Sequence, residues 1–277
     1  MQPKNASKNE QQPVQPWQIA MFQRSLKKQQ KLKALLDLLG NTQGKHCLLV
    51  TCGDNNGALN WHFRAHGGSW TWADVSGENN DQIAELLGEP VYSLPENLFP
   101  FPDEHFDCVV SIDVLEHLPQ DQPFLRELGR VLKKDGRAVV TVPNGDSGLL
   151  ANRIKWRMGM TPEVYGHTRA GYTLSELSQA VSQSGLQPCA SGGYSRFFTE
   201  MIELAINYGY VKVLSKKRGG AAPGHIAPLS SGELKTHGLA YRVYALVFPI
   251  ASAISRLDLL LPQKTDNAVI VAAEKKG

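Results

Sequence analysis

A short glycine turn follows the first apolar run of the chain and could hold a nucleotide ligand. It lies in LLVTCGDNNGAL, residues 48–59, where Gly53 and Gly57 enclose two asparagines. Glycine lets the backbone approach a ligand closely, and the helix behind the turn offers N–H groups to an anion. Asp74 closes the next apolar run, where a carboxylate can accept hydrogen bonds from both hydroxyls of a ribose. Turn and acid together predict a cofactor that contains adenosine; an ordinary strand-to-helix corner with a capping Asp is the alternative.

Two histidines are candidates for a general base, since the unperturbed pKa of a histidine side chain suits this work. His117 lies in VLEHL and His167 in YGHTRAGYT, where Arg169 and Tyr172 follow it. The planar guanidinium of Arg169 could clamp a carboxylate or phosphate, so we expect Arg169 and Tyr172 to contact a substrate. The alternatives are a structural hydrogen bond for His117, a solvent-exposed loop position for His167 and a surface position for Arg169.

Apolar runs alternate with helical patterns along the chain. Strands are predicted at residues 45–50, 69–75, the start of 89–105, 106–112, 137–142 and 267–276. Helices are predicted at residues 17–39, 58–66, 78–88, 122–136 and 171–185, the last with a capping box of Thr173 and Glu176. This alternation predicts an α/β fold with a doubly wound, Rossmann-like sheet that binds ligands beyond the carboxyl ends of its strands. Asn144 and Asp146 follow the strand at 137–142, so we expect them to contact a substrate unless they only cap local turns.

Composition limits the class of protein. The chain has 277 residues, 42% of them hydrophobic and 20% charged, which allows one large core. Its net charge of +3 is too small to predict a nucleic-acid partner. The four cysteines form no CxxC pair and lie mostly in apolar runs, so we expect reduced thiols and no metal site. The polar N-terminus carries no secretory signal, which predicts a cytoplasmic location.

Four segments are predicted along the chain: a disordered arm at 1–16, a core with a leading helix at 17–199, a helical insertion or lid at 200–263, and the last strand at 264–277. Four basic residues gather in the insertion without an acid: Lys212, Lys216, Lys217 and Arg218. The run 243–255 carries no charge but is too short to span a bilayer, which needs about 20 residues. It predicts either a core helix of the insertion or an interfacial helix, with peripheral membrane contact through 212–255.

A longer motif indicates the family. FPFPDEHFDCVVSIDVLEHLPQ, followed by LGRVLKKDGRAVVTVPN, closely resembles the segment around the fourth and fifth strands of class I S-adenosylmethionine-dependent methyltransferases. The resemblance covers about residues 45–185 and the terminal strand, and it is nearly silent on substrate. It implies a mostly parallel sheet with an antiparallel C-terminal strand, and S-adenosylmethionine as cofactor. The residues that it implies for cofactor binding are Gly53, Asn55, Asn56, Gly57, Asp74, Val75, Ile112 and Asp113.

Three positions depart from the pattern of this family. Thr51 stands where relatives have an acid, and Asn55 stands where they have the middle glycine of the turn. Ser93 or Leu94 stands where they have an Asp after the third strand, for which residues 96–97 could substitute. Asparagine tolerates a left-handed backbone better than most residues, so the turn can still form. Two lost hydrogen bonds would weaken cofactor binding about a hundredfold without abolishing it.

We therefore expect an S-adenosylmethionine-dependent enzyme that methylates an oxygen of a small-molecule, lipid or glycan acceptor. An apolar insertion beside basic residues suits a lipid or a lipid-linked glycan, at a membrane-associated location. The alternative is a non-catalytic methyltransferase-like module that uses the altered turn and the insertion to bind a partner. A nicotinamide-dependent oxidoreductase is disfavoured because the turn lacks G-x-G-x-x-G. Methylation of RNA or protein needs a basic groove or a recognition domain, and the sequence shows neither.

Overall fold

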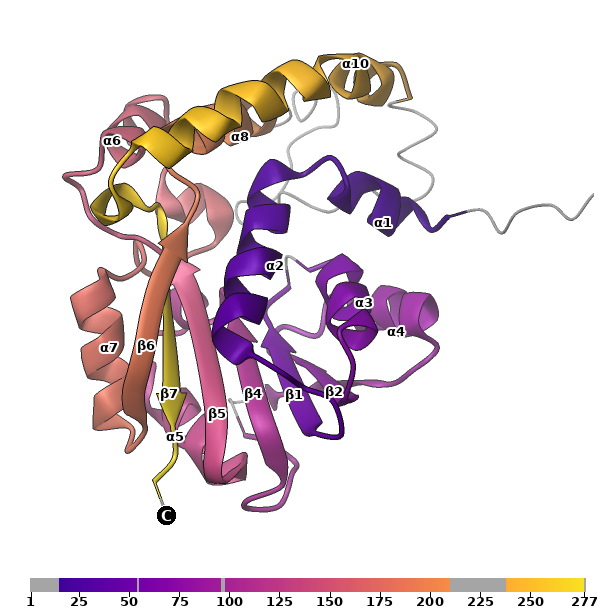
Figure 1. The fold of residues 1–277 in the computed structure, drawn as a ribbon, viewed down its shortest axis with the longest axis vertical. Helices are drawn as coiled ribbons and strands as arrows, with labels where there is room; N and C mark the ends of the chain where they lie inside the picture. Colours follow the sequence, from indigo (N-terminus) through magenta and orange to yellow (C-terminus); the bar gives the residue numbers. More distant parts are fainter. Residues whose placement is uncertain (1–14, 54, 96–97, 210–237, 277) are drawn as a thin grey trace, which may run out of the picture.

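The computed structural model describes residues 15–53, 55–95, 98–209 and 238–276. The basic residues at 212–218, most of the predicted arm at 1–16 and the pair at 96–97 lie outside the described residues. The described part of the chain forms one sheet, with helices on both faces and a helical layer across one end (Figure 1).

The sheet has seven strands in the order β3-β2-β1-β4-β5-β7-β6. Their bounds are β1 His46–Thr51, β2 Ser69–Asp74, β3 Val91–Ser93, β4 Phe106–Ile112, β5 Leu132–Pro143, β6 Gln187–Tyr194 and β7 Ala268–Glu274. The pairs from β3 to β5 are parallel, whereas β7 runs antiparallel to both β5 and β6. The predicted doubly wound, mostly parallel sheet with an antiparallel C-terminal strand is therefore confirmed.

The side chains of the central strands alternate between two hydrophobic clusters, one on each face of the sheet. In β1, Leu48 and Val50 join one cluster, while Cys47 and Leu49 join the other. The helices whose side chains complete the first cluster are α5 Gln122–Val131 and α7 Leu174–Gln183. The second cluster is completed by α1 Trp17–Phe22, α2 Leu26–Leu39, α3 Ala58–Ala65 and α4 Asn80–Leu87. From β1 the chain adds β2 and β3 on one side of the sheet, and it then continues with β4 and β5 on the other side. The strand order therefore reverses between β1 and β4, and α/β sheets bind their ligands at such a point.

Two predicted helices have wrong bounds. The leading helix is broken after Phe22, and the Gln29 side chain amide donates to the carbonyls of Phe22 and Gln23, which ends α1. The helix at 122–136 ends at Val131, because the buried Leu132 pairs with Phe106 and joins β5. Propensity favours helix at these residues, but strand pairing at a buried position outweighs it.

The sequence patterns also miss an edge strand and one helix. Strand β6, QPCASGGY, is largely exposed and contains a proline and two glycines, so it has no apolar alternation to reveal it. It pairs with β7 over residues 187–194. Helix α6, Leu150–Arg157, is mostly polar and was likewise not predicted.

The helical layer consists of α6, α8 Phe197–Gly209 and α10 Gly238–Ser255, and it lies across the carboxyl ends of the parallel strands (Figure 1). The segment that carries α8 and α10 leaves and rejoins the sheet at neighbouring residues, because the Asn267 N–H donates to the Ser195 carbonyl at 2.7 Å beside the Tyr194–Ala268 pair. None of the helices in the described part of the chain is long and apolar enough to cross a bilayer.

Candidate functional site

The glycine turn after β1 needs glycine at both of its outer positions. Gly53 has φ 59° and Gly57 has φ 87°, a left-handed backbone that other residues adopt at a cost. A Cβ on Gly53 would lie 2.8 Å from Ser76 Oγ, and one on Gly57 would lie 2.9 Å from Leu86 Cδ2. The turn therefore packs tightly against the segment that follows β2.

Asp74 lies at the centre of this packing, fully buried at the carboxyl end of β2. Its carboxylate accepts from the Thr51 hydroxyl at 2.6 Å and from the Gly53 N–H at 3.1 Å. It also accepts from the Ser76 N–H, the Ser76 hydroxyl and the Gly77 N–H, each at 2.9 Å. Five donors thus surround the Asp74 carboxylate, and a ribose would have to compete with some of them.

The two asparagines of the turn bind the start of α3. Asn55 Oδ1 accepts from the Gly57 N–H at 3.1 Å, and Asn56 Oδ1 accepts from the Ala58 N–H at 3.2 Å. The Asn55 side chain also donates to Asn60 Oδ1 at 2.6 Å. These side chains occupy helix N–H groups that an anion could otherwise use. Cofactor binding by Asn55 and Asn56 stays a prediction.

Asp113 follows β4 at the same edge of the sheet, in a left-handed conformation with φ 49°. Its Oδ2 forms an ion pair with Lys31 of α2, and both side chains are largely buried. The other carboxylate oxygen, Oδ1, is buried and has no hydrogen-bond partner among the described residues. Ile112 is buried beside it, and Val75 packs partly buried against the core after β2. Asp113 therefore presents one acceptor that the described part of the chain leaves available.

Glu116, His117 and His167 come together near Asp113. One ligand atom of each of the three lies within 4.8 Å of the others. The rings of His117 and His167 meet edge to face, with centroids 4.8 Å apart. Burial lowers the pKa of His167 to about 4, and the adjacent His117 acts in the same direction, so the His167 ring is uncharged at neutral pH. The two histidines predicted as catalytic are thus neighbours in space.

Arg169 and Tyr172 bind to Asp121 at the start of α5. The Arg169 guanidinium lies 3.3 Å from Asp121 Oδ2 and 2.6 Å from the Tyr172 hydroxyl. Tyr172 donates to the same carboxylate oxygen at 2.6 Å, and burial with this hydrogen bond raises the pKa of Tyr172. Since Tyr172 also belongs to the buried core, this trio fastens the loop before α7. A substrate role for the pair stays a prediction.

Asn144 and Asp146 organise the loop between β5 and α6. Asn144 Nδ2 donates to the Asp266 carbonyl at 2.8 Å, and Asn144 Oδ1 accepts from the Asp146 N–H at 3.0 Å. Asp146 Oδ1 accepts from the Gly148 N–H at 2.7 Å. Asn152 Nδ2 donates to the carbonyls of Asn144 and Asp146. Turn capping thus accounts for these contacts, and a substrate role stays a prediction.

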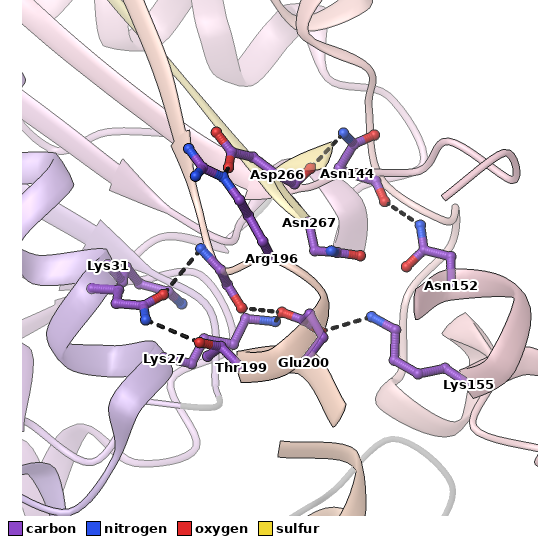
Figure 2. A network of polar contacts seen from close by, with 12 residues as sticks. Lys27, Lys31, Asn144, Asn152, Lys155, Arg196, Thr199, Glu200, Asp266 and Asn267 are labelled. Carbon is purple, nitrogen blue, oxygen red and sulfur yellow. Dashed lines mark hydrogen bonds and ion pairs between the residues drawn. The ribbon is translucent and has the colours of Figure 1, made fainter. Parts of the chain in front are cut away.

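The sequence analysis missed a buried ionic network beneath the helical layer, drawn in Figure 2. Glu200 of α8 is 2% exposed and pairs with Lys27 of α2 at 2.7 Å and with Lys155 of α6 at 2.9 Å. Burial alone would raise the pKa of Glu200, but the two lysines outweigh it and lower that pKa to about 2. The Ser195 hydroxyl also donates to this carboxylate. The network ties the helical layer to the leading helix.

A second set of contacts fixes the start of α8. Asp258, which follows α10, accepts from the N–H groups of Phe198 at 2.8 Å and Thr199 at 3.0 Å. Arg196 donates to Asp266 at 2.6 Å (Figure 2). It also donates to the Asp258 carbonyl at 2.7 Å. A residue far along the chain thus caps this helix, a link that local sequence patterns do not reveal.

One part of this arrangement matches a known family. Residues 48–140, from β1 into β5, match a family model described as a methyltransferase domain. The match covers about a third of this chain. The matched residues include the glycine turn, Asp74 and the Glu116–His117 pair, whereas His167 and the helical layer lie outside the match.

The chain is similar to curated proteins of mycobacteria. It is 34% identical over 102 residues to phthiotriol/phenolphthiotriol dimycocerosates methyltransferase of Mycobacterium leprae, covering 35% of this chain and 37% of that protein. It is 35% identical over 95 residues to a probable S-adenosylmethionine-dependent methyltransferase of Mycobacterium tuberculosis, covering 34% of this chain and 31% of that protein. The chain thus spans about a third of the length of these relatives.

A solved structure extends the similarity of fold beyond residues 48–140. Phosphoethanolamine N-methyltransferase 2 of Haemonchus contortus, in complex with S-adenosyl-L-methionine, has a TM-score of 0.55. The superposition covers 89% of this chain and 52% of that chain at 14% identity, which shows a common fold.

Proposed function

We propose that this protein transfers a methyl group from S-adenosylmethionine to an oxygen of a small-molecule, lipid or glycan acceptor. The observation that carries the proposal is the match of residues 48–140 to a methyltransferase domain. The matched segment holds the turn and the acid that sequence analysis assigns to the cofactor, at the edge of the sheet where α/β folds bind ligands.

The side chains at this edge have the chemistry that such a cofactor needs. Asp74 offers a carboxylate to the ribose hydroxyls, and Asp113 Oδ1 offers a buried acceptor to the α-ammonium group. Val75 and Ile112 supply apolar surface beside these acids. When bound, S-adenosylmethionine supplies an electrophilic methyl group on a positively charged sulfur. The protein must hold the acceptor in line with that methyl and keep water away.

The histidine pair supports methylation of a hydroxyl, whose proton must leave as the new bond to carbon forms. His117 Nδ1 lies 3.2 Å from the Gly166 carbonyl. Because a carbonyl only accepts, Nδ1 carries the hydrogen, and Nε2 keeps a lone pair for the acceptor's proton. His167 packs against this ring and is uncharged at neutral pH. His117 is therefore our choice of base, with His167 beside it.

An apolar surface of the helical layer supports a lipid acceptor and peripheral membrane contact. Several large side chains on and after α10 face solvent, among them Leu246 at 79% exposed and Ile250 at 63%. Exposed apolar patches of this kind mark contacts with partners or lipid. The relative from M. leprae carries the word dimycocerosates in its name. These two observations together favour a lipid over a freely soluble acceptor.

Calorimetry with S-adenosylhomocysteine tests the cofactor half of this proposal. We expect micromolar binding to the full chain and loss of that binding in Asp74→Ala. Asp81→Ala is the matched control, because Asp81 is an exposed acid in the first turn of α4. Transfer of labelled methyl from S-adenosylmethionine to lipid and aqueous extracts then tests the acceptor. Label confined to the aqueous extract would exclude a lipid acceptor.

The non-catalytic module remains the second candidate, and one observation favours it. Five donors of the chain already satisfy Asp74, so this buried acid needs no nucleotide to complete its hydrogen bonds. Calorimetry separates the two candidates, because absence of binding at millimolar S-adenosylhomocysteine would favour the module.

A further inference from the structure

A carboxylate and two imidazoles meet at the carboxyl end of β4. The ligand atoms of Glu116, His117 and His167 all lie within 4.8 Å of one another. Glu116 is fully buried, and the two histidines are partly buried. Bonds of about 2.1 Å to one ion require ligand atoms about 3.4 Å apart, so small side-chain movements would close the set around a metal.

The surroundings of these residues orient them as metal ligands usually are. The His117 Nδ1–H donates to the Gly166 carbonyl at 3.2 Å, which fixes the tautomer and directs the Nε2 lone pair away from that carbonyl. A hydrogen bond of this kind from the second ring nitrogen accompanies almost every histidine that binds a metal.

Hydrogen bonds of Thr168 also hold His167 close to Glu116 and His117. The Thr168 N–H and hydroxyl donate to the Glu116 carbonyl at 2.8 and 2.9 Å, and the hydroxyl also lies 3.1 Å from the Leu118 carbonyl. Thr168 therefore keeps the loop that carries His167 against the turn that carries Glu116 and His117. Loop and turn are distant in sequence, which is why spacing alone predicts no metal site.

We infer that Glu116, His117 and His167 form a binding site for a divalent transition metal ion, with positions left open for an oxygen of the acceptor. Two imidazoles and one carboxylate suit Zn²⁺, Fe²⁺ or Mn²⁺, whereas Ca²⁺ and Mg²⁺ prefer sites made of oxygen alone. Three protein ligands are also the number found at catalytic sites, where a further position is kept for water or substrate.

The role of this ion in methyl transfer rests on the proposed function. A hydroxyl bound to a divalent cation loses its proton to solvent more readily. The resulting oxygen attacks the methyl carbon, the bond from sulfur to that carbon breaks, and the sulfonium leaves as a neutral thioether. In this form of the site the histidines act as ligands, and no histidine is needed as the base.

Titration of the full chain with Co²⁺, followed by its visible absorption, tests the site without any cofactor. We expect one bound ion that Zn²⁺ displaces. His167→Ala and Glu116→Gln should each weaken Co²⁺ binding at least tenfold. His105→Ala is the matched control, because the rings of His105 and His46 form another histidine pair, 4.7 Å apart. Unchanged affinity in the first two variants, or loss of binding in the control, would overturn the inference.

Two further measurements keep this test separate from folding and from the proposed function. Thr168→Val removes the hydroxyl that holds the loop but leaves all three ligands, and it should weaken Co²⁺ binding with little change in thermal unfolding. All variants should still bind S-adenosylhomocysteine as the unsubstituted chain does. Retained cofactor binding with no metal binding in the unsubstituted chain would end the metal proposal alone.

Discussion

The hydroxyl of Thr51 donates a 2.6 Å hydrogen bond to Oδ2 of Asp74, across two strands in which these residues are register partners. An acid at position 51 would place two carboxylates side by side on the same face of the sheet. Threonine instead gives Asp74 a donor, so the departure from the family's pattern supports the neighbouring acid. The altered strand end therefore supplies Asp74 with a hydrogen-bond donor.

Thr51→Val should lower both stability and cofactor affinity. The substitution keeps the shape of the side chain but removes a buried donor to a charged acceptor, which costs about 2 kcal/mol. We expect a similar decrease in the free energy of unfolding in urea and about tenfold weaker binding of S-adenosylhomocysteine by calorimetry. Thr51→Ser keeps the hydroxyl and should behave like the unsubstituted chain. Equal behaviour of the two variants would contradict this role for the hydroxyl.

Glu200→Gln should destabilise the protein at neutral pH. It should also make the free energy of unfolding depend less on pH in the acid range. The folded pKa of Glu200 is about 2, below the unfolded value of about 4.5. The stabilisation is therefore present above pH 4.5 and is lost as the pH falls towards 2, a contribution of about 3 kcal/mol. Urea unfolding at pH 7 and at pH 3 measures the difference in free energy of unfolding between Glu200→Gln and the unsubstituted chain. This difference should be smaller at pH 3.

Glu203→Gln is the matched control for Glu200→Gln. The two acids lie on the same helix, but the fold lowers the pKa of Glu200 and raises the pKa of Glu203. Burial raises the pKa of Glu203, so its charged form opposes folding at neutral pH. We expect this variant to be as stable as the unsubstituted chain or more stable at pH 7. A large loss of stability in Glu203→Gln would show that any polar change on α8 is harmful.

Asp258→Asn should loosen the start of α8. An amide provides one acceptor oxygen where the carboxylate uses two, so one N–H group of the first turn loses its partner. Loss of such a cap costs about 1 kcal/mol. Hydrogen exchange of the amides in α8 should accelerate about fivefold, while exchange in β1 and β4 stays unchanged. Asp37→Asn, a change at an exposed acid of α2, should leave both regions as they are.

Leu246→Glu and Ile250→Glu should reduce binding to vesicles. Burying one such side chain in lipid contributes about 2 kcal/mol, and the new charge opposes it, so each substitution should weaken partition at least tenfold. Co-flotation with vesicles of anionic phospholipid measures the effect. Leu98→Glu is the control, since Leu98 is 61% exposed in the loop between β3 and β4. Absence of flotation for the unsubstituted chain would exclude the membrane contact.

The central strands and the helices that cover them could be predicted because local patterns specify them. Strand β4 is predicted at residues 106–112 and found there, since all of its side chains but one are buried. The capping box of Thr173 and Glu176 is present in both of its hydrogen bonds. By contrast, β6 forms by pairing with β7. It is a largely exposed edge strand, so its sequence has no apolar alternation that predicts it.

The candidate site could be predicted only where residues adjacent in sequence make it. The turn with Gly53 and Gly57 is local, and its left-handed glycines are in place. The pairing of Glu200 with Lys27 and Lys155 joins three helices from distant parts of the chain. Charge patterns can be compared only within one helix or hairpin, so such contacts follow from the fold and not from spacing.

The meeting of Ser195 and Asn267 on the sheet has a consequence for how this protein can diversify. The chain leaves β6 after Tyr194 and returns to β7 at Ala268, and these two residues are register partners in adjacent antiparallel strands. Doubling the length of a flexible loop costs only about 0.6 kcal/mol, so the segment between these residues can be exchanged for another without rebuilding β6 or β7. Chimeras joined at these two residues would carry a new segment between β6 and β7 on an unchanged sheet.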